Sequence, residues 1–279
     1  MRFIKMHGIG NDYVYIDCFQ ETVADPAQLA VRMSDRHFGI GGDGLILIMP
    51  SAVADARMRM FNADGSEAQM CGNGIRCVAK YVYEAGIARK PELAIETLAG
   101  ILRLQLFTAE GMVEKVRVNM GMPRLRRQDI PMLGEGERVL GEKLTAGGRE
   151  FEVTCVSMGN PHCVIYVDDV AQFPVGQYGP LLEHHPQFPQ RTNVEWVEWL
   201  NRREIRQRTW ERGTGETLAC GTGACAATVA SILNGKTERA VTVHLVGGDL
   251  EIEWAADNHV YMTGPAVEVF RGEWPEWPE

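Results

Sequence analysis

The segment FNADGSEAQMCGNGIRCVAKYVYEAG, residues 61–86, recurs in the second half of the chain as WERGTGETLACGTGACAATVASILNG, residues 210–235. Cys220 follows Cys71 by 149 residues (220 − 71 = 149). Both copies contain Cys-Gly-x-Gly and both end in a glycine, Gly86 or Gly235. A repeat at a fixed interval indicates a duplicated structural unit, so this stretch determines how the rest of the chain is interpreted.

Each copy places its cysteine where a strand-like segment changes to a helix-like one. After Cys71, apolar residues recur at helical spacing until Gly86. The segment after Cys220 consists mainly of small residues and ends at Gly235. A helix with so little polar surface is typical of one enclosed by a sheet. We therefore expect one helix per repeat, over residues 72–85 and 221–234.

Strand-like segments precede each helix in the same order. They are residues 1–8, 11–17, 44–50 and 56–62 in the first half, and 150–157, 162–168, 193–200 and 204–211 in the second. A hairpin pattern follows each helix, over 101–121 and 241–265. The predicted fold class is α+β, with two pseudo-symmetric lobes, each a mostly antiparallel sheet or barrel wrapped around a central helix.

The repeat also predicts the domain boundaries. Residues 1–120 form the N-terminal lobe and residues 121–264 the C-terminal lobe. The segment from about 265 to 279 has strand character, and we expect it to return to the first lobe. Residues 134–148 are predicted to form a polar loop because glycine and charged residues recur there.

Composition narrows the function classes. A net charge of −9 over 279 residues gives no support to nucleic-acid binding. No apolar run approaches the length of a membrane-spanning helix, and the first residues lack the apolar core of a signal peptide. Seven cysteines are an odd number for a disulfide framework, so reduced thiols and a cytoplasmic location are expected.

The two Cys-Gly-x-Gly motifs predict the chemistry. The first amides of a helix have no partners within the helix, so they can bind a carboxylate. The partial positive charge of the helix N-terminus also favours a thiolate, so we expect it to lower the pKa of each thiol. Glycines beside the cysteines let the backbone approach a ligand closely.

Stereoinversion at an α-carbon needs a base on one face and an acid on the other. Two such motifs, facing each other across the lobe interface, would supply both groups, so Cys71 and Cys220 are the predicted acid–base pair. The remaining cysteines are predicted to be structural. The spacings Cys71–Cys77 and Cys220–Cys225 are unlike those of a zinc site, so no metal is expected. Oxidation of two facing thiols to an inactive disulfide is a further possibility.

Four segments carry a resemblance to a known family. They are MHGIGNDYVYID (residues 6–17), FNADGSEAQMCGNGIR (61–76), MGNPHCV (158–164) and WERGTGETLACGTGACA (210–226). The chain resembles the diaminopimelate epimerases over nearly its whole length. The resemblance implies interconversion of LL- and meso-2,6-diaminopimelate, a step toward lysine and peptidoglycan precursors, without pyridoxal phosphate. It also implies a homodimer.

The resemblance assigns roles to individual residues. Cys71 and Cys220 match the catalytic cysteines, and His162 and Glu211 match positions thought to tune the thiol pKa values. The matching substrate-binding positions are Asn11, Asn62, Gly72, Asn73, Asn160, Asn193, Glu211, Arg212, Gly221 and Thr222. For this substrate, Arg212 would hold the distal carboxylate bidentately and Glu211 would pair with the distal ammonium.

The two lobes differ around their cysteines, and one position departs from the family. His162 occupies in the second repeat the place of Tyr13 in the first, and Glu211 that of Asn62. Gly44 stands where some members carry glutamine, so a hydrogen bond from that side chain is absent, or backbone or water replaces it.

Other functions remain open at this stage. A racemase of another amino acid, such as histidine, could use the same scaffold, although the distal residues favour a doubly zwitterionic substrate. Phenazine-type isomerases of the wider group generally lack the cysteine pair. A non-catalytic amino-acid-binding module is the alternative from another class. Incorporation of solvent deuterium at Cα separates an enzyme from a binding protein.

Overall fold

The computed structural model describes residues 1–275, and these divide into two compact units. Unit 1 comprises Met1–Val118 together with the described residues from Thr263 onward, and unit 2 comprises Asn119–Met262. Residues 276–279, which the sequence assigns to the returning segment, lie outside the described residues.

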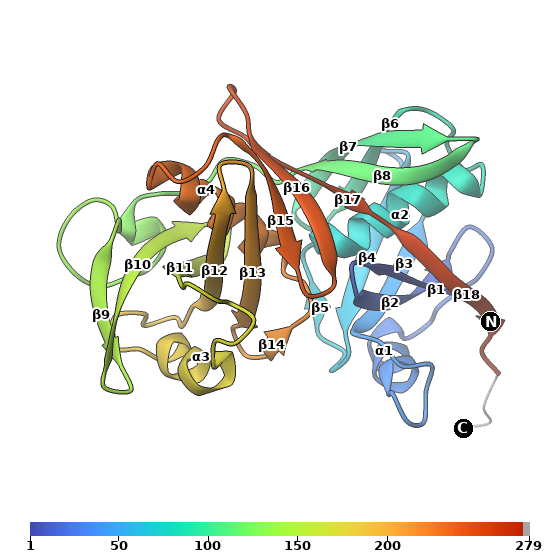
Figure 1. Cartoon of the computed structure of the whole chain (residues 1–279). Coiled ribbons are helices and arrows are strands. Elements are labelled where there is room, and N and C mark those ends of the chain that lie inside the picture. Colours follow the sequence, from blue (N-terminus) through green and yellow to red (C-terminus); the bar gives the residue numbers. More distant parts are fainter. Residues whose placement is uncertain (276–279) are drawn as a thin grey trace. The chain divides into compact units, whose positions relative to one another are not determined.

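Unit 1 contains two helices and a continuous series of paired strands (Figure 1). Its elements are β1 (Arg2–Gly8), β2 (Asn11–Asp17), α1 (Pro26–Ser34), β3 (Gly44–Met49), β4 (Ala56–Asn62), β5 (Glu67–Ala68), α2 (Gly72–Glu84), β6 (Glu92–Thr97), β7 (Gly100–Ala109), β8 (Met112–Asn119) and β18 (Val267–Glu273). The strands pair in the order β18, β1, β2, β3, β4, β6, β7, β8. The β2–β3 and β4–β6 pairs are parallel, and the other pairs of this series are antiparallel.

Unit 2 repeats this plan. Its elements are the short helix η1 (Arg127–Asp129), β9 (Glu142–Ala146), β10 (Arg149–Ser157), β11 (Pro161–Tyr166), α3 (Val175–Glu183), β12 (Asn193–Asn201), β13 (Glu204–Glu211), β14 (Gly215–Thr217), α4 (Gly221–Leu233), β15 (Ala240–Leu245), β16 (Gly248–Trp254) and β17 (Val260–Pro265). The strands pair in the order β9, β10, β11, β12, β13, β15, β16, and only β11–β12 and β13–β15 are parallel in this series.

The parallel pairs fall at the same two places in both units, so the pairing pattern itself is duplicated. In unit 1 the strand outside β1 is β18, from the C-terminal end of the chain, whereas in unit 2 the strand outside β10 is β9. The predicted α+β fold with two pseudo-symmetric lobes is confirmed.

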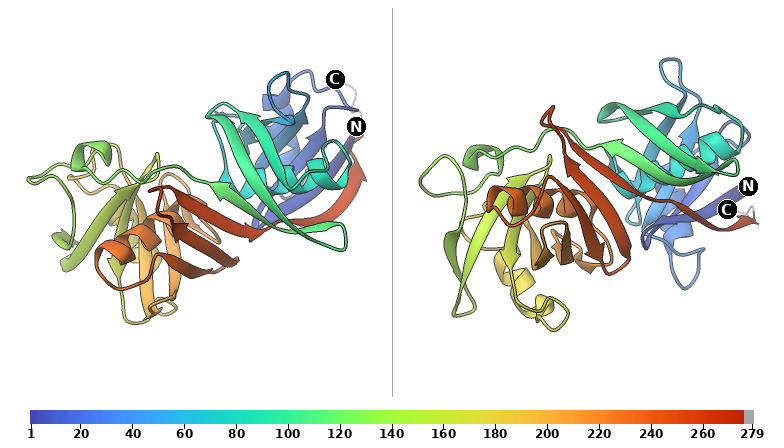
Figure 2. Two further views of the ribbon diagram at one scale, coloured as in Figure 1. Left: turned by 90° about the horizontal axis from the view of Figure 1, so that it is seen from above. Right: turned by 45° about the horizontal axis from the view of Figure 1, so that its top comes forward.

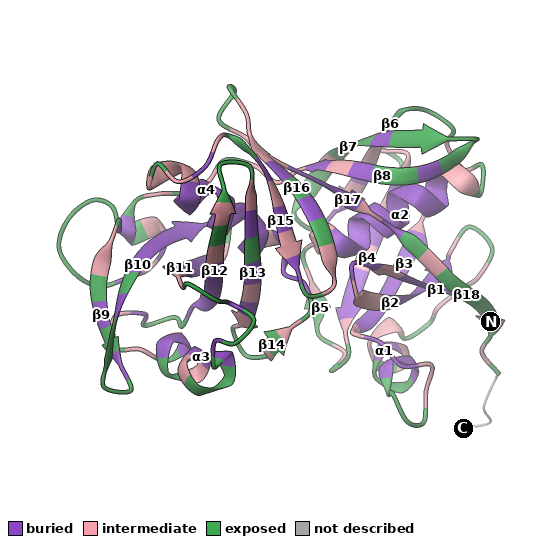
Figure 3. Ribbon diagram, in the orientation of Figure 1, coloured by how far each residue is buried: buried purple, intermediate pink, exposed green. Residues whose placement is uncertain are grey.

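A helix lies among the strands of each unit (Figure 2). Helix α2 contacts β1, β2, β4 and β7, and α4 contacts β10, β11, β12, β15 and β16. Both are drawn mostly as buried in Figure 3. In α4, Ala224, Ala226, Ala227 and Ala230 have no exposed surface, because only small side chains allow strands to approach it from several directions. Within the described chain no helix, α4 included, is long and apolar enough to span a bilayer.

The structure adds elements that the sequence pattern did not predict. Helix α1 begins at Pro26, and the side chain of Asp25 accepts a hydrogen bond from Gln28 N, a standard N-terminal cap. Helix α3 occupies the equivalent connection in unit 2. The prediction of a loop across 134–148 is wrong for β9, where Leu144 and Ala146 point into the core while polar residues face outward. A strand this short shows too few alternations to stand out in a polar sequence.

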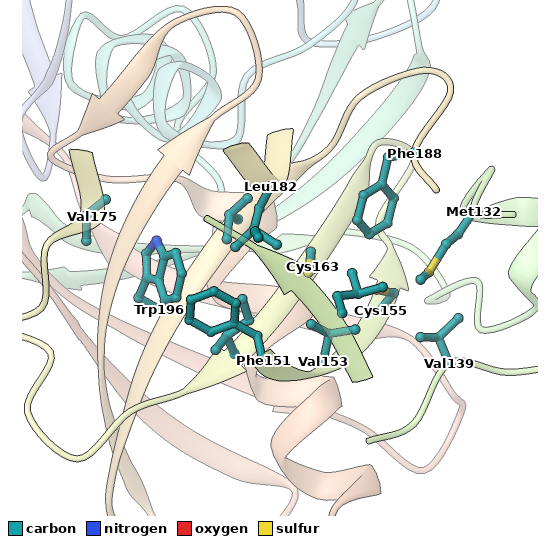
Figure 4. Packing of buried hydrophobic residues seen from close by; sticks show 14 of the residues in the cluster. Met132, Val139, Phe151, Val153, Cys155, Cys163, Val175, Leu182, Phe188 and Trp196 are labelled. Atoms are coloured by element: carbon teal, nitrogen blue, oxygen red, sulfur yellow. The ribbon is translucent and has the colours of Figure 1, made fainter. Parts of the chain in front are cut away.

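The core of unit 2 contains packed aromatic rings among aliphatic side chains (Figure 4). Trp196 stacks on Phe173 with ring centroids 4.3 Å apart, and Phe151 meets Trp196 edge-on at 5.6 Å. Cys155 and Cys163 lie opposite each other on β10 and β11 inside this cluster. Neither is in a disulfide, and both fill volume in the core. The same holds for the buried Cys77 and Cys225, whereas Cys18 is half-buried.

Candidate active site

Both predicted catalytic cysteines are the N-cap residues of the two central helices. Cys71 caps α2 with an extended backbone (φ −133°, ψ 121°), and Cys220 caps α4 in the same way (φ −113°, ψ 109°). The sulfur of Cys71 accepts a hydrogen bond from Gly74 N at 3.4 Å, and that of Cys220 from Gly223 N at 3.3 Å. Each sulfur therefore lies at the positive end of a helix dipole.

The second glycine of each motif is required by packing. A Cβ atom on Gly74 would lie 2.6 Å from Cδ1 of Ile46, and one on Gly223 would lie 2.6 Å from Oε1 of Glu195. These two glycines therefore admit a neighbouring side chain of the same unit against the first helical turn. From the sequence, the motif glycines are expected only to let a ligand approach the backbone closely.

Uncharged polar groups surround Cys71. Its thiol donates to Oδ1 of Asn11 at 3.3 Å, and the amide of Asn11 donates to Asp43 Oδ2 at 2.7 Å, which fixes the orientation of Asn11. The hydroxyl of the buried Tyr13 lies near Asn11 and Cys71. Burial first, and then the adjacent thiol, raise the pKa of Tyr13 far above its ordinary value, so the phenol stays protonated.

Gly44 is explained by the same tyrosine. Gly44 pairs with Tyr13 in the parallel β2–β3 register, and a Cβ atom there would lie 2.1 Å from the Phe61 carbonyl oxygen and 2.9 Å from Tyr13 Cε1. A glutamine side chain would meet the main chain of Phe61 and the Tyr13 ring at this position. The sequence left two expectations, that the glutamine hydrogen bond is absent or that backbone or water replaces it, and these close contacts fit the first.

The remaining predicted residues of unit 1 lie at the first turn of α2 and at the end of β4. Gly72 and Asn73 are the first two residues of α2, where main-chain N–H groups are suited to bind an anion. The Asn73 side chain is buried and accepts from Arg76 Nη1 at 3.0 Å, so its main-chain amide is the group suited to substrate. Asn62 ends β4 and donates to Ser66 Oγ at 2.9 Å.

A polar relay leads to Cys220 in unit 2. Nε2 of His162 lies 3.0 Å from Oδ1 of Asn160, and the Asn160 amide donates to Thr222 Oγ1 at 3.3 Å. Thr222 Oγ1 lies 3.5 Å from the sulfur of Cys220. The structure thus brings His162, Asn160, Thr222 and Cys220 together, with His162 reaching the thiol through two intervening side chains.

Glu211 acts electrostatically on Cys220. Its carboxylate accepts from Thr217 Oγ1 at 2.5 Å, and its charge lies near the thiol of Cys220. Burial raises the pKa of Glu211 above its ordinary value. Burial also raises the pKa of Cys220 well above 9.0, and the carboxylates of Glu211 and Glu195 add to that rise. The expectation that the helix N-terminus lowers the thiol pKa is therefore wrong for Cys220, because burial and two negative charges outweigh the dipole.

Two residues predicted to bind the distal end of the substrate, Asn193 and Arg212, lie next to each other. The buried Asn193 side chain donates to the Pro161 carbonyl at 2.7 Å and accepts from Arg212 N at 2.9 Å. The exposed guanidinium of Arg212 donates to the Gln190 carbonyl at 3.0 Å and has further donors to offer a carboxylate. Gly221 is the first residue of α4 and presents its main-chain N–H there.

The sequence pattern did not identify several residues of the site. The most buried is Glu195 on β12, which contacts His162, and Gln207 and Thr209 on β13 contact Glu195 in turn. One signal in the sequence could have identified Glu195. It is a glutamate in the middle of a strand that follows a parallel crossover, and both faces of such a strand are covered, so its side chain is buried. Thr217, which binds Glu211, lies in a turn-rich segment and gave no signal.

Comparison with known proteins agrees with the geometry. A family model described as diaminopimelate epimerase matches residues 3–126 and 154–269. The chain is 60% identical over 277 residues to a diaminopimelate epimerase from Moorella thermoacetica, and 59% identical over 277 residues to one from Pelotomaculum thermopropionicum, with 99% of each chain covered. A phenazine biosynthesis protein of the PhzF family from Bacillus anthracis shares the fold (TM-score 0.73, 18% identity, 99% of each chain covered).

Proposed function

The chain belongs to the diaminopimelate epimerase family and is an isomerase, and we propose that it inverts one α-carbon of 2,6-diaminopimelate with the thiols of Cys71 and Cys220. The observation that carries this proposal is the matched pair of N-cap cysteines, one in each unit. Each thiol stands beside helical amides that suit a carboxylate, so each unit offers half of what stereoinversion needs.

The proposed reaction moves one proton. The thiolate of one cysteine takes the Cα proton, and the electron pair of the broken C–H bond passes to Cα and its carboxylate. The thiol of the other cysteine then donates its proton to the opposite face, which leaves that cysteine as the thiolate. Amides of Gly72, Asn73 and Gly221 stabilise the charge that develops on the carboxylate. The step balances with the two thiols and the substrate alone, and it is proposed without pyridoxal phosphate, as the family resemblance implies.

Cys220 is suited to be the protonated partner before substrate binds. Its raised pKa keeps the thiol protonated at neutral pH. The Glu211 carboxylate adds to this rise in the pKa of Cys220, which supports its thiol-tuning role. Asn11 and Tyr13 supply the corresponding uncharged contacts to Cys71.

The distal end of the substrate gives the proposed specificity. Arg212 can bind the second carboxylate, and Asn193 fixes the backbone of Arg212. Asn62 and Asn160 add donors and acceptors without net charge. A histidine racemase would have no use for the Arg212 guanidinium, so diaminopimelate is the favoured substrate.

Cys71→Ala and Cys220→Ala test the proposal directly. Wild-type protein in deuterated water should introduce deuterium at Cα of LL-diaminopimelate and form the meso isomer. Each variant should lose interconversion by roughly 10²- to 10⁴-fold, because one proton-transfer group is missing. Cys225→Ala, which removes a buried thiol of α4, is the matched control and should keep its activity.

Three results would contradict the proposal. Wild-type turnover by either cysteine variant would remove the two-thiol mechanism. Faster exchange into L-histidine than into diaminopimelate would favour the alternative racemase. Tight binding of diaminopimelate with no exchange would favour a non-catalytic binding module.

We further propose a homodimer and a cytoplasmic location. The family resemblance supports the first, and a reducing compartment, which keeps both catalytic thiols available, supports the second. Light scattering of the purified protein measures the mass, and a mass of one chain would contradict the dimer.

A further inference from the structure

Glu195 is a buried carboxylate to which the proposed reaction gives no role. It lies on β12, where its side chain has no exposed surface. A buried carboxylate is unfavourable unless hydrogen bonds and charge compensate for the water it has lost. An apolar residue would fill this place in the core at lower cost, so the arrangement of its partners is informative.

The partners commit the two oxygens of Glu195 to different neighbours. Oε2 accepts from Gln207 Nε2 at 2.7 Å and from Thr209 Oγ1 at 2.6 Å. Gln207 Nε2 also donates to Thr209 Oγ1 at 2.9 Å, so the threonine hydroxyl hydrogen is left for Glu195. Oε1 faces Nδ1 of His162 at 2.7 Å. Because a carboxylate oxygen accepts, Nδ1 of His162 carries a proton.

His162 connects this carboxylate to the surroundings of Cys220. Its ring is fully buried, and its other nitrogen, Nε2, lies 3.0 Å from Oδ1 of Asn160, which can only accept, so Nε2 donates to it. The relay through Asn160 and Thr222 then reaches the thiol. The Glu195 carboxylate also lies against the first turn of α4, since it is what a Cβ on Gly223 would strike. The charged group facing this cluster from β13 is Glu211.

Among its described residues, unit 1 has no counterpart of the pair formed by Glu195 and His162. At the same place in the repeat Ile46 lies against Gly74, and Tyr13 stands in the position of His162. The carboxylate–imidazole pair therefore has a role in the half of the site that contains Cys220. It is not needed for the fold that the two units share.

We propose that Glu195 is a positioning residue, which keeps a proton on Nδ1 of His162 and fixes the ring so that Nε2 is presented to Asn160. This inference rests on the proposed function, because its effect on turnover passes through Cys220. The arrangement resembles other sites in which a buried carboxylate sets the tautomer and orientation of an imidazole. Fixing Nε2 fixes the amide of Asn160 and, through it, the hydroxyl of Thr222.

Glu195→Gln is the sharpest test, because the surrounding donors determine how the new amide is oriented. Gln207 and Thr209 still donate to the site of Oε2, so the amide oxygen occupies that site. The NH₂ group then faces His162 Nδ1, which must become an acceptor, so the ring keeps only its proton on Nε2. The variant preserves shape but removes the proton from Nδ1.

The measurements are ¹⁵N NMR of His162 and steady-state kinetics on LL-diaminopimelate. We expect a proton on Nδ1 in the wild type and its loss in Glu195→Gln. We expect kcat to fall roughly ten-fold or more, with KM changed by less than about three-fold, because the substrate does not touch Glu195. Thr209→Val, which removes one donor but leaves the carboxylate on Nδ1, should keep the Nδ1 proton.

Three outcomes would overturn the inference. They are an unprotonated Nδ1 in the wild type, a retained Nδ1 proton in Glu195→Gln, and an unchanged kcat despite loss of the Nδ1 proton. If Glu195→Gln does not fold, Glu195→Asp, which withdraws the carboxylate by one methylene, takes its place with the same expected loss of kcat. Failure of the proposed function is distinguishable, because the wild type would then not exchange diaminopimelate, whereas the NMR result would still report on Glu195.

Discussion

At the scale of single residues, nearby carboxylates mark the surroundings of Cys220. Cys220 is buried with Glu211 and Glu195 nearby, and all three influences favour its protonated form. The contacts of Cys71 include the neutral side chain of Asn11, which accepts from the thiol. A thiol held in its protonated form suits a reaction that needs an acid and a base at the same time.

Glu211→Gln tests the charge beside Cys220. Burial raises the pKa of Glu211 above its ordinary value of 4.5. A group whose pKa is raised on folding contributes its full stability below pH 4.5, and that contribution is lost as pH rises through the folded-state pKa. We expect urea unfolding at pH 4 and pH 7.5 to show that stability shifts in favour of the variant at the higher pH. Its kcat should fall roughly 10²-fold. Parallel pH profiles of stability would contradict the assignment.

Arg212→Met tests the distal contact. The guanidinium is exposed and has donors to offer a second carboxylate, which diaminopimelate has and lysine lacks. Binding energy from a remote group can appear in turnover as well as in affinity. We expect the variant to raise KM and lower kcat for diaminopimelate, each roughly ten-fold, and to leave the slow exchange of lysine unchanged. Equal losses with both substrates would show that Arg212 acts on folding or on the thiols.

At the scale of secondary structure, the starts of α2 and α4 carry both the thiols and a closely packed glycine. Gly74 admits the end of Ile46, whose methyl group can rotate away. Gly223 admits the carboxylate of Glu195, which is held by hydrogen bonds to His162, Gln207 and Thr209. The same glycine thus meets a movable neighbour in one helix and a fixed one in the other.

Gly223→Ala and Gly74→Ala form a matched pair. Overpacking a rigid site destabilises a protein by about 1–3 kcal/mol, whereas a flexible neighbour accommodates an added methyl group at smaller loss. We expect Gly223→Ala to lower the free energy of unfolding by this amount and Gly74→Ala by less than about 1 kcal/mol. Urea unfolding of both variants gives the comparison. A larger loss for Gly74→Ala would mean that Glu195 is free to move.

At the scale of the whole molecule, the C-terminal strand completes the N-terminal unit. Strand β18 pairs with β1 from Arg2–Glu273 to His7–Val267, and Met1 and Trp274 exchange main-chain hydrogen bonds of 3.0 and 2.7 Å. Unit 1 therefore lacks this strand during synthesis until residues 267–273 have been made.

Truncation after Pro265 tests this dependence. Removal of β18 leaves the main-chain groups of β1 without their partner on one side. We expect hydrogen exchange to lose protection in β1 and β2, while β10–β13 of unit 2 keep theirs. Truncation after Pro275, which keeps all of β18, is the control and should match the full chain. Equal loss of protection in both units would show that they unfold together.

The sequence was sufficient for the elements that carry a clear local signal. The repeat of Cys-Gly-x-Gly with a terminal glycine located both central helices, because N-cap and stop signals act over a few residues. Alternating apolar residues located most of the strands. Helices α1 and α3 and strand β9 were missed, because short elements are stabilised by what they pack against rather than by their own pattern.

The sequence by itself determined the duplicated plan, the two N-cap thiols and the family to which the chain belongs. Only the tertiary structure decided the charge and proton arrangement around those thiols. Glu195 reads in the sequence as an ordinary strand residue, and Tyr13 and Gly44 as unrelated neighbours of two strands. Their roles come from burial and from contacts between residues distant in the chain. The physical reason is that a helix cap is a local property of the backbone, whereas a pKa depends on everything that replaces water around the group.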